Sequence, residues 1–315
     1  MKRRKFLENC MIVGAGMTIS SMGNCGKKEQ VGKRKLGKTG EKLSMIGFGG
    51  IIVMDETIQT ARERVAAAVD RGINYFDVAP TYGNAETRLG PALKPYRKDS
   101  FLACKTTQRK KDGARQELEN SLKNLQTDYF DLYQLHALTT EEDVEEAFGP
   151  DGAMEVFLKA KRDGLVRYLG FSAHSEKAAL MAMERYDFDT ILFPINYVCW
   201  HKGKFGKRVV QKAQEKNMGI LALKGLAYSR IPEGQEDPYE KLWYIPIEDS
   251  TIADLSLRFT LSQGVTAAVP PGDYSFFNPA IDIACNYKPL SKSEKETLID
   301  SQKDAIPLFT GKSKV

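Results

Sequence analysis

The segment that most constrains the fold spans residues 73–90, where an apolar stretch ends at an acid and a tyrosine follows on a turn. Ile73–Val78 is a short apolar run that carries Asp77 near its end. A proline and a glycine then predict a turn, and helical spacing resumes over Glu86–Leu93. Tyr82 therefore lies on a strand-to-helix loop just after a strand-end carboxylate. This arrangement is typical of active sites in parallel α/β proteins.

Two later apolar runs also end in ionisable side chains. Phe101–Lys105 ends in a lysine, and Tyr129–His136 ends in a histidine. If these strands are parallel to the first, their carboxyl ends share one face of the sheet. We therefore expect four side chains to meet there: Asp77, Tyr82, Lys105 and His136.

These motifs resemble those of the aldo-keto reductases. Gly-Ile-Asn-Tyr-Phe-Asp at 72–77 and Asp-Leu-Tyr-Gln-Leu-His at 131–136 match that family, and the Asp-Tyr-Lys-His tetrad matches in order and approximate spacing. The resemblance extends from about Lys35 to Asn286. It implies a (β/α)8 TIM barrel with an N-terminal β-hairpin, and an enzyme that interconverts a carbonyl and an alcohol by hydride transfer with a nicotinamide dinucleotide.

The resemblance gives each tetrad residue a role that its chemistry supports. Negative charge builds on the carbonyl oxygen during hydride transfer, so a proton donor is needed there, and Tyr82 would be that general acid. The ammonium of Lys105 would stabilise the phenolate, since a free phenol has a pKa of about 10. Asp77 would hold Lys105, and His136 would orient the substrate oxygen.

Each tetrad residue also has a plain structural explanation, namely a capping acid, a rim lysine, a packing tyrosine or a core histidine. Two other functions remain open for the whole cluster. A non-redox sugar lyase or epimerase could use the same groups for proton transfer, and a non-catalytic barrel subunit could retain them without turnover.

The resemblance also points to residues that would contact NADP or NAD, and three positions depart from the family pattern. Ala173, Leu192 and Leu223 replace residues that usually contact the nicotinamide. The region 273–285, where relatives hold the 2′-phosphate of NADP, lacks lysine and arginine and contains Asp282. Because a carboxylate repels a phosphate and can accept from a ribose hydroxyl, these residues weaken the expectation of NADP. The candidate cofactor contacts are Gly49, Gly50, Ser172, Asn196, Lys224, Gly272 and Asn286.

Aromatic residues mark a substrate region. Trp200 lies in a loop predicted at the barrel rim, where it would suit a sugar or ring-bearing substrate, although simple packing is equally consistent. The long loop 229–247 carries Trp243 and Tyr244 and is a candidate lid. His174 offers a replacement donor beside Ala173, or a packed loop histidine.

The N-terminal segment indicates export. Residues 1–28 have a basic start with Arg3-Arg4 and a weakly apolar centre, which resembles a twin-arginine signal and predicts a periplasmic protein or one anchored to the membrane facing the periplasm. Cys25 stands in a poor lipoprotein box, which leaves a lipid tether open. The barrel is expected over 33–290, beginning with a hairpin at 33–42 and a first strand at 43–48, with a tail over 291–315.

The composition limits which other classes of protein the chain could belong to. At 315 residues, one barrel fits the chain, and much of the formal charge of +5 comes from the leader. Basic residues do not cluster with aromatics after the leader, so we expect no nucleic-acid partner. The five cysteines form no ligand-like cluster, so we expect no metal. Cys199 is predicted in an exposed loop, and the acidic run 141–146 in a solvated one.

Overall fold

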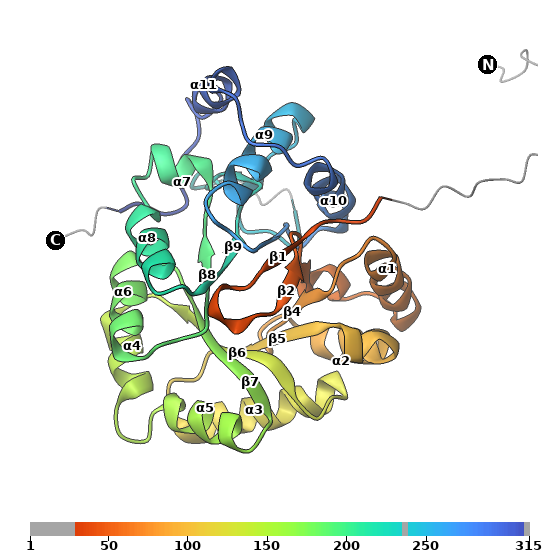
Figure 1. The fold of residues 1–315 in the computed structure, drawn as a ribbon, viewed down its shortest axis with the longest axis vertical. Coiled ribbons are helices and arrows are strands. Elements are labelled where there is room, and N and C mark those ends of the chain that lie inside the picture. Colours follow the sequence, from red (N-terminus) through yellow and green to blue (C-terminus); the bar gives the residue numbers. More distant parts are fainter. Residues whose placement is uncertain (1–28, 235–238, 312–315) are drawn as a thin grey trace, which may run out of the picture.

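The computed structural model describes residues 29–234 and 239–311, and Figure 1 shows them as a ring of helices around a barrel of strands. The predicted leader, including Cys25, lies outside the described residues. The sheet contains eight parallel strands in the order β12-β9-β8-β7-β6-β5-β4-β3. A bridge between Ile46 and Ala268 joins the two ends of this sheet. The chain is therefore a (β/α)8 TIM barrel, as predicted.

The barrel strands follow one another along the chain with helices between them. Those strands are β3 (Phe48–Gly49), β4 (Tyr75–Asp77), β5 (Phe101–Thr106), β6 (Phe130–Leu138), β7 (Val166–Ala173), β8 (Thr190–Pro194), β9 (Gly219–Leu223) and β12 (Ala267–Val269). The described helices are α1 (Ile58–Asp70), α2 (Ala85–Leu93), α3 (Lys111–Leu125), α4 (Glu141–Phe148), α5 (Ala153–Arg162), α6 (Glu176–Arg185), α7 (Tyr197–His201), α8 (Lys207–Glu215), α9 (Ser250–Leu261), α10 (Phe277–Cys285) and α11 (Lys292–Asp300).

An antiparallel hairpin closes one end of the barrel, as the resemblance implied. It consists of β1 (Lys33–Lys35) and β2 (Lys42–Ser44), which cross the barrel end that faces the viewer in Figure 1. Leu36 and Leu43 of this hairpin pack against side chains inside the barrel. Gly219 allows the close approach, because a Cβ there would lie 2.3 Å from Leu36 Cδ1. The hairpin therefore plugs the end opposite the candidate site.

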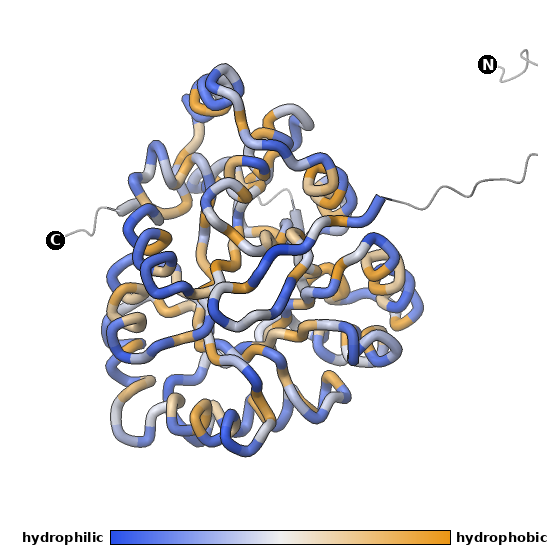
Figure 2. The backbone as a smooth tube through the Cα atoms, in the orientation of Figure 1, coloured by the Kyte–Doolittle hydropathy of each residue, from blue (hydrophilic) through white to orange (hydrophobic). Residues whose placement is uncertain are grey.

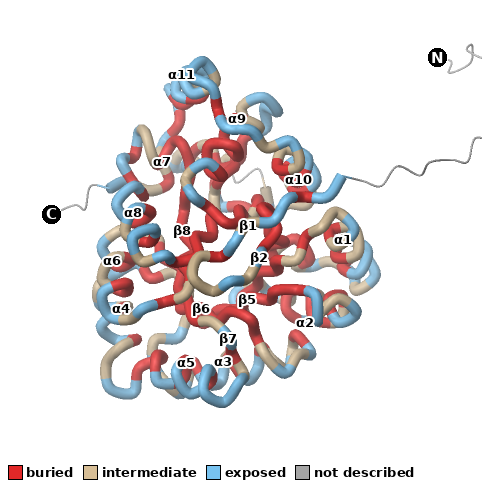
Figure 3. Tube along the Cα trace, in the orientation of Figure 1, coloured by how far each residue is buried: buried red, intermediate tan, exposed pale blue. Residues whose placement is uncertain are grey.

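The helices bury one face each against the strands. Figure 2 shows apolar residues turned toward the strands and hydrophilic ones turned outward, and Figure 3 shows the matching change from buried to exposed. This amphipathic pattern is what a helix needs to cover a sheet. Because the parallel strands are buried on both faces, their sequences are nearly continuous apolar runs. A polar residue in such a run therefore needs a partner or a function.

Three local predictions are wrong. The first barrel strand is Phe48–Gly49, because Leu43 belongs to the hairpin. The acidic run forms α4 instead of a loop, since Thr140 and Asp143 make a capping box at its start. Cys199 is buried in α7 because the C-terminal segment around Leu308 covers this side of the barrel.

Residues 291–311, the described part of the predicted tail, begin with α11 and return across the barrel rim. Leu298 of this helix packs in an apolar cluster with residues of α7 and α9. The fully buried guanidinium of Arg258 on α9 pairs with Glu294 of α11 at 2.9 Å and with Asp254 at 2.7 Å. The described part of the C-terminal segment is therefore joined to the barrel by burial and by ion pairs.

A second, two-stranded ribbon lies in the predicted lid region. It pairs β10 (Ala227–Ser229) with β11 (Ile245–Pro246). The intervening chain includes Lys241–Tyr244, which reaches the mouth of the barrel. The ribbon therefore fixes both ends of the lid.

Candidate active site

The centre of the site is an ion pair between neighbouring strands. Asp77 ends β4, and Lys105 lies near the end of β5, which pairs with β4 in parallel. The ammonium of Lys105 pairs with Asp77 Oδ1 and donates to the carbonyl of Val78 at 3.1 Å. Burial alone would lower the pKa of Lys105, but the charges of Asp77 and Tyr82 and the hydrogen bond to Asp77 together outweigh burial and raise that pKa. Lys105 is therefore held as a buried cation.

Two further residues fix the second oxygen of Asp77. Its Oδ2 accepts hydrogen bonds from the Tyr75 hydroxyl at 3.0 Å and from the Gln134 amide at 3.3 Å. We did not predict either contact from the sequence. Side chains two residues apart on a strand point to the same face, and this alternation could have indicated both contacts. Tyr75 lies two residues before Asp77, and Gln134 lies two residues before His136. The carboxylate is thus fully engaged within the protein.

The structure brings Tyr82 against the lysine and the histidine. Lys105 Nζ lies 5.1 Å from the centroid of the Tyr82 ring. The ring of His136 stands edge-on to Tyr82, with 5.8 Å between centroids and an interplanar angle of 85°. Burial raises the pKa of Tyr82, and this effect exceeds the opposing effect of Lys105. The expected influence of Lys105 is present, but the net pKa of the phenol lies above its ordinary value.

A bulge in β6 positions His136. The pairing of β6 with β7 shifts between Leu135 and Leu138, and Ala137 has a φ of 53°. Arg109 supports this turn by donating to the carbonyl of His136 at 2.8 Å. Nδ1 of His136 is buried and has no hydrogen-bond partner among the described residues. Burial, aided by Lys105, lowers the pKa of His136 to about 3, so the imidazole is neutral near pH 7.

A small cavity of about 80 Å³ lies over Asp77 and Tyr82. Gly49 and Gly272, two of the predicted cofactor contacts, form part of its wall. A Cβ on Gly272 would lie 2.4 Å from Ile51 Cγ2. The glycines therefore allow close backbone approach on this side. The remaining lining residues are Ile51, Leu192, Leu223, Lys224, Lys241, Leu242, Trp243, Tyr244, Val269, Pro270 and Pro271.

The lid closes this cavity from above. Lys241 donates to the carbonyl of Met54 at 2.7 Å and pairs with Glu56 at 3.0 Å. The next residues, Leu242, Trp243 and Tyr244, line the cavity. A ligand of dinucleotide size needs several hundred Å³. The lid must therefore move before such a ligand can enter.

The other predicted cofactor contacts divide into two groups. Ser172 is buried close to the tetrad, where its hydroxyl oxygen accepts from the Ala137 amide at 2.7 Å. Gly50 packs behind the wall, since a Cβ there would lie 2.7 Å from Val78. Lys224 lines the cavity itself.

Three predicted contacts lie away from the cavity. The Asn196 side chain hydrogen-bonds with the backbone. Its amide nitrogen donates to the Lys224 carbonyl at 3.0 Å, and its oxygen accepts from the Cys199 backbone amide at 2.9 Å. Trp200 packs edge-on against Phe259 at 6.0 Å between ring centroids. Asn286 is exposed at the end of α10. Trp243 lines the cavity and Trp200 does not.

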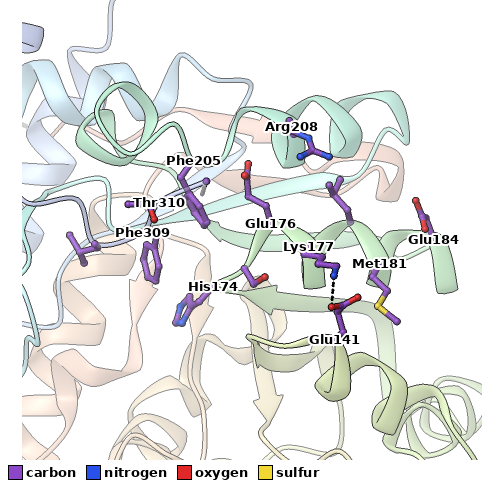
Figure 4. Close-up of a pocket in the computed structure, with 14 residues that line it drawn as sticks. Glu141, His174, Glu176, Lys177, Met181, Glu184, Phe205, Arg208, Phe309 and Thr310 are labelled. Carbon is purple, nitrogen blue, oxygen red and sulfur yellow. Dashed lines mark ion pairs between the residues drawn. The ribbon is translucent and has the colours of Figure 1, made fainter. Parts of the chain in front are cut away.

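A groove of about 700 Å³ lies beside the site, between α6, α8 and the C-terminal segment (Figure 4). His174 stands at one end of this groove beneath Phe309, with 5.1 Å between their ring centroids. Its ring also lies 6.4 Å from that of Trp243. Burial, with a contribution from Lys224, lowers the pKa of His174 to about 4. His174 therefore connects the groove with the lid.

Neither a metal centre nor a membrane span emerges in the part of the chain that the structure describes. Across 29–234 and 239–311, His, Cys, Asp and Glu side chains do not gather in a group that could hold a metal ion. Within the same ranges, every helix is too short or too polar to cross a bilayer.

Comparison with known proteins gives a family and a fold. An uncharacterized oxidoreductase of Bacillus subtilis, YqkF, is 34% identical over 155 residues, which is 45% of this chain and 48% of that protein. L-galactose dehydrogenase of Arabidopsis thaliana is 27% identical over 225 residues, which is 64% of this chain and 67% of that protein. This chain therefore matches about half the length of the first relative.

A solved structure of an aldo-keto reductase from Bacillus halodurans in its holo form superposes with a TM-score of 0.68 at 23% identity. The match covers 90% of this chain and 100% of that one, and it supports the fold. The model of the Aldo/keto reductase family matches residues 45–242, which include the whole tetrad. The chain belongs to the aldo/keto reductase family.

Proposed function

We propose that the protein is an oxidoreductase that interconverts a carbonyl and an alcohol with a nicotinamide dinucleotide. The observation that carries this proposal is the buried Lys105–Asp77 ion pair beneath the Tyr82 ring, with His136 edge-on to the same ring. Membership of the aldo/keto reductase family supports the same activity.

Each tetrad residue has a role that follows from its protonation state. Tyr82 has a raised pKa and therefore carries the proton that a carbonyl oxygen must receive during reduction. Lys105 is a permanent cation beside it and stabilises the phenolate that remains after the transfer. Asp77 keeps that cation in place. His136 is neutral and can hydrogen-bond to the substrate oxygen without repelling Lys105.

The residues of the wall fit a nicotinamide dinucleotide. Gly49 and Gly272 present backbone without side chains, and Ser172 has a hydroxyl hydrogen available for an amide. A bound dinucleotide would supply the hydride. Leu192 and Leu223 offer only an apolar surface, so fewer polar groups would hold the nicotinamide than the family pattern implied.

We further propose a preference for NAD over NADP. A pocket of about 450 Å³ next to the lid contains the cations Arg64 and Lys241, but both pair with Glu56. Asp55, Glu240 and Asp273 line the same pocket, so carboxylates outnumber cations there. A 2′-phosphate would be repelled, whereas a ribose diol can donate to a carboxylate. A higher kcat/KM with NADPH than with NADH would contradict this preference.

The substitution Tyr82→Phe tests the proposed acid. We expect kcat for carbonyl reduction to fall roughly 10²- to 10⁴-fold, because general acid catalysis contributes that much. The Kd for the nucleotide should stay within about a factor of two, since the ring remains in place. Tyr186→Phe is the matched control, because this ring packs on Phe188 outside the site. Full activity in Tyr82→Phe would remove the assignment.

A non-redox lyase or epimerase acting on sugars is the second candidate. The apolar positions Leu192 and Leu223 favour it, because they give the nicotinamide no polar contact. Absorbance of the reduced nicotinamide separates the two functions. Substrate-dependent loss of this absorbance supports the oxidoreductase, and product formation without any loss supports the alternative.

We also propose that the protein is exported with its nucleotide bound. The proposal rests on the basic Arg3-Arg4 leader of the sequence, since twin-arginine export carries folded proteins. A periplasm holds no free nucleotide pool from which a spent cofactor could be replaced. The bound nucleotide would therefore be reduced by one substrate and reoxidised by another.

A further inference from the structure

Lys224 lines the cavity, and within 29–234 and 239–311 its ammonium has no counter-ion. It follows β9 directly and lines the same cavity as Tyr82. Among the described residues, no ion pair or hydrogen bond involves its Nζ. Burial lowers the pKa of Lys224 to about 8, so much of it is still charged near pH 7. An amine held this way is costly unless something else compensates for its lost hydration.

Two aromatic rings of the lid flank this ammonium. Its Nζ lies 4.4 Å from the centroid of the Trp243 ring and 4.5 Å from that of Tyr244. These contacts stabilise a cation and limit where the side chain can point. The backbone of Lys224 has a φ of 68°, a conformation that favours glycine. A lysine therefore occupies a strained backbone position in which a glycine would cost less conformational energy.

The described residues that line the cavity with Lys224 are aromatic and apolar side chains, a second lysine and one carboxylate. His174 shares Trp243 as a neighbour and is affected by the charge of Lys224, and His136 is affected in turn by His174. The carboxylate that lines the cavity, Asp77, is already bound by Lys105, Tyr75 and Gln134. The positive charge at Lys224 therefore remains unneutralised beside the candidate carbonyl site.

We propose that Lys224 binds a carboxylate of the carbonyl substrate, so that the preferred substrates are oxo acids rather than neutral carbonyl compounds. The inference rests on the proposed oxidoreductase function and adds its substrate class. An incoming carboxylate would take the missing counter-ion position, while Tyr82 serves the carbonyl of the same molecule. The pyrophosphate of the cofactor has similar anionic oxygens, and the experiment separates the two sources.

The test compares 4-carboxybenzaldehyde with its neutral match, methyl 4-formylbenzoate, using NADH and NADPH as reductants. The variants are Lys224→Met, which removes the charge, and Lys224→Arg, which keeps it. Met and Arg meet the same backbone strain as Lys, so the comparison isolates the charge. Lys207→Met is the control, because Lys207 also lies over a tryptophan ring, at 5.8 Å from Trp200, but away from the cavity.

We expect Lys224→Met to lower kcat/KM for the carboxylate roughly 10- to 100-fold and for the ester less than about threefold, since a hydrogen bond to a charged group contributes on this scale. Lys224→Arg should retain most of the preference, and Lys207→Met should change neither value. Equal losses for both aldehydes together with a raised nucleotide Kd would assign Lys224 to the pyrophosphate and overturn the proposal. Unchanged values for both aldehydes would also overturn it.

A binding measurement keeps the two proposals separate. Tryptophan fluorescence follows titration with 4-methylbenzoate and with neutral 4-methylbenzamide, neither of which can be reduced. Tighter binding of the benzoate that is lost in Lys224→Met supports the carboxylate site even if neither aldehyde is turned over, in which case only the proposed function fails. Equal binding of both compounds to the unmodified protein would contradict the carboxylate site even if both aldehydes are reduced.

Discussion

Residues at the ends of neighbouring strands set the protonation states on which the chemistry depends. Lys105 stays charged because Asp77 is beside it, and Tyr75 and Gln134 also donate hydrogen bonds to the Asp77 carboxylate. Tyr82 stays protonated because burial exceeds the influence of Lys105. A buried cation and a protonated phenol therefore lie next to each other.

The histidines make a prediction about stability. The pKa values of His136 and His174 are about 3 and about 4 in the fold, whereas an unfolded histidine titrates near 6.5. Between these values the unfolded state binds more protons, so the free energy of unfolding should fall as the pH drops below about 6.5. Urea unfolding between pH 7.5 and 5 measures this change.

The double variant His136→Asn, His174→Asn provides the comparison. Its free energy of unfolding should depend less steeply on pH across the same interval, because the variant lacks two histidines whose pKa values are lowered in the fold. The acids with strongly lowered pKa values, Asp143 and Glu294, at about 2, act mainly below this interval. Identical slopes for both proteins would show that the histidines are not buried in neutral form.

At the scale of elements, the sequence predicted the tetrad because its side chains follow apolar runs whose carboxyl ends must share one face. The hairpin and most helices were also predictable from local spacing. Asn196 and Trp200 were not, because their partners, the Lys224 carbonyl and Phe259, come from distant segments. The ion pair of Lys241 with Glu56 depends on a similar long-range contact.

The lid offers a prediction about nucleotide binding. We propose that the lid opens before a dinucleotide binds, because the cavity is only about 80 Å³, and that the bonds of Lys241 to Glu56 and Met54 break as it opens. Lys241→Met should therefore raise the association rate of the nucleotide several-fold, since two partly buried polar contacts are lost. Stopped-flow tryptophan fluorescence measures this rate. Lys292→Met, at the start of α11, is the control. An unchanged rate in Lys241→Met would show that the bonds of Lys241 do not hold the lid closed.

At the scale of the whole molecule, the residues that close the barrel and the residues of the candidate site lie at opposite ends of it. The hairpin plugs one end with Leu36 and Leu43, and the tetrad and lid occupy the other. The described C-terminal segment adds α11, joined to the barrel through Arg258. Changes at the lid can therefore alter ligand binding without opening the core.

The proposed export of a nucleotide-bound protein makes a prediction at this scale. Protein isolated from the periplasm and then denatured should release about one nucleotide per chain, and we expect that nucleotide to be NAD. Arg3→Lys, Arg4→Lys should keep the protein in the cytoplasm, because a twin-arginine signal needs both arginines. Periplasmic protein that is empty and also fails to bind added nucleotide would contradict the proposal.

The most direct test of the central claim follows the transferred hydrogen. With NADH deuterated at both C4 positions and 4-carboxybenzaldehyde as substrate, mass spectrometry of the alcohol should find one deuterium on the carbinol carbon at each turnover, and Tyr82→Phe should form this product far more slowly. Product without deuterium, or equal rates for the two proteins, would contradict an active site in which Tyr82, supported by Lys105 and Asp77, protonates a carbonyl as it receives a hydride.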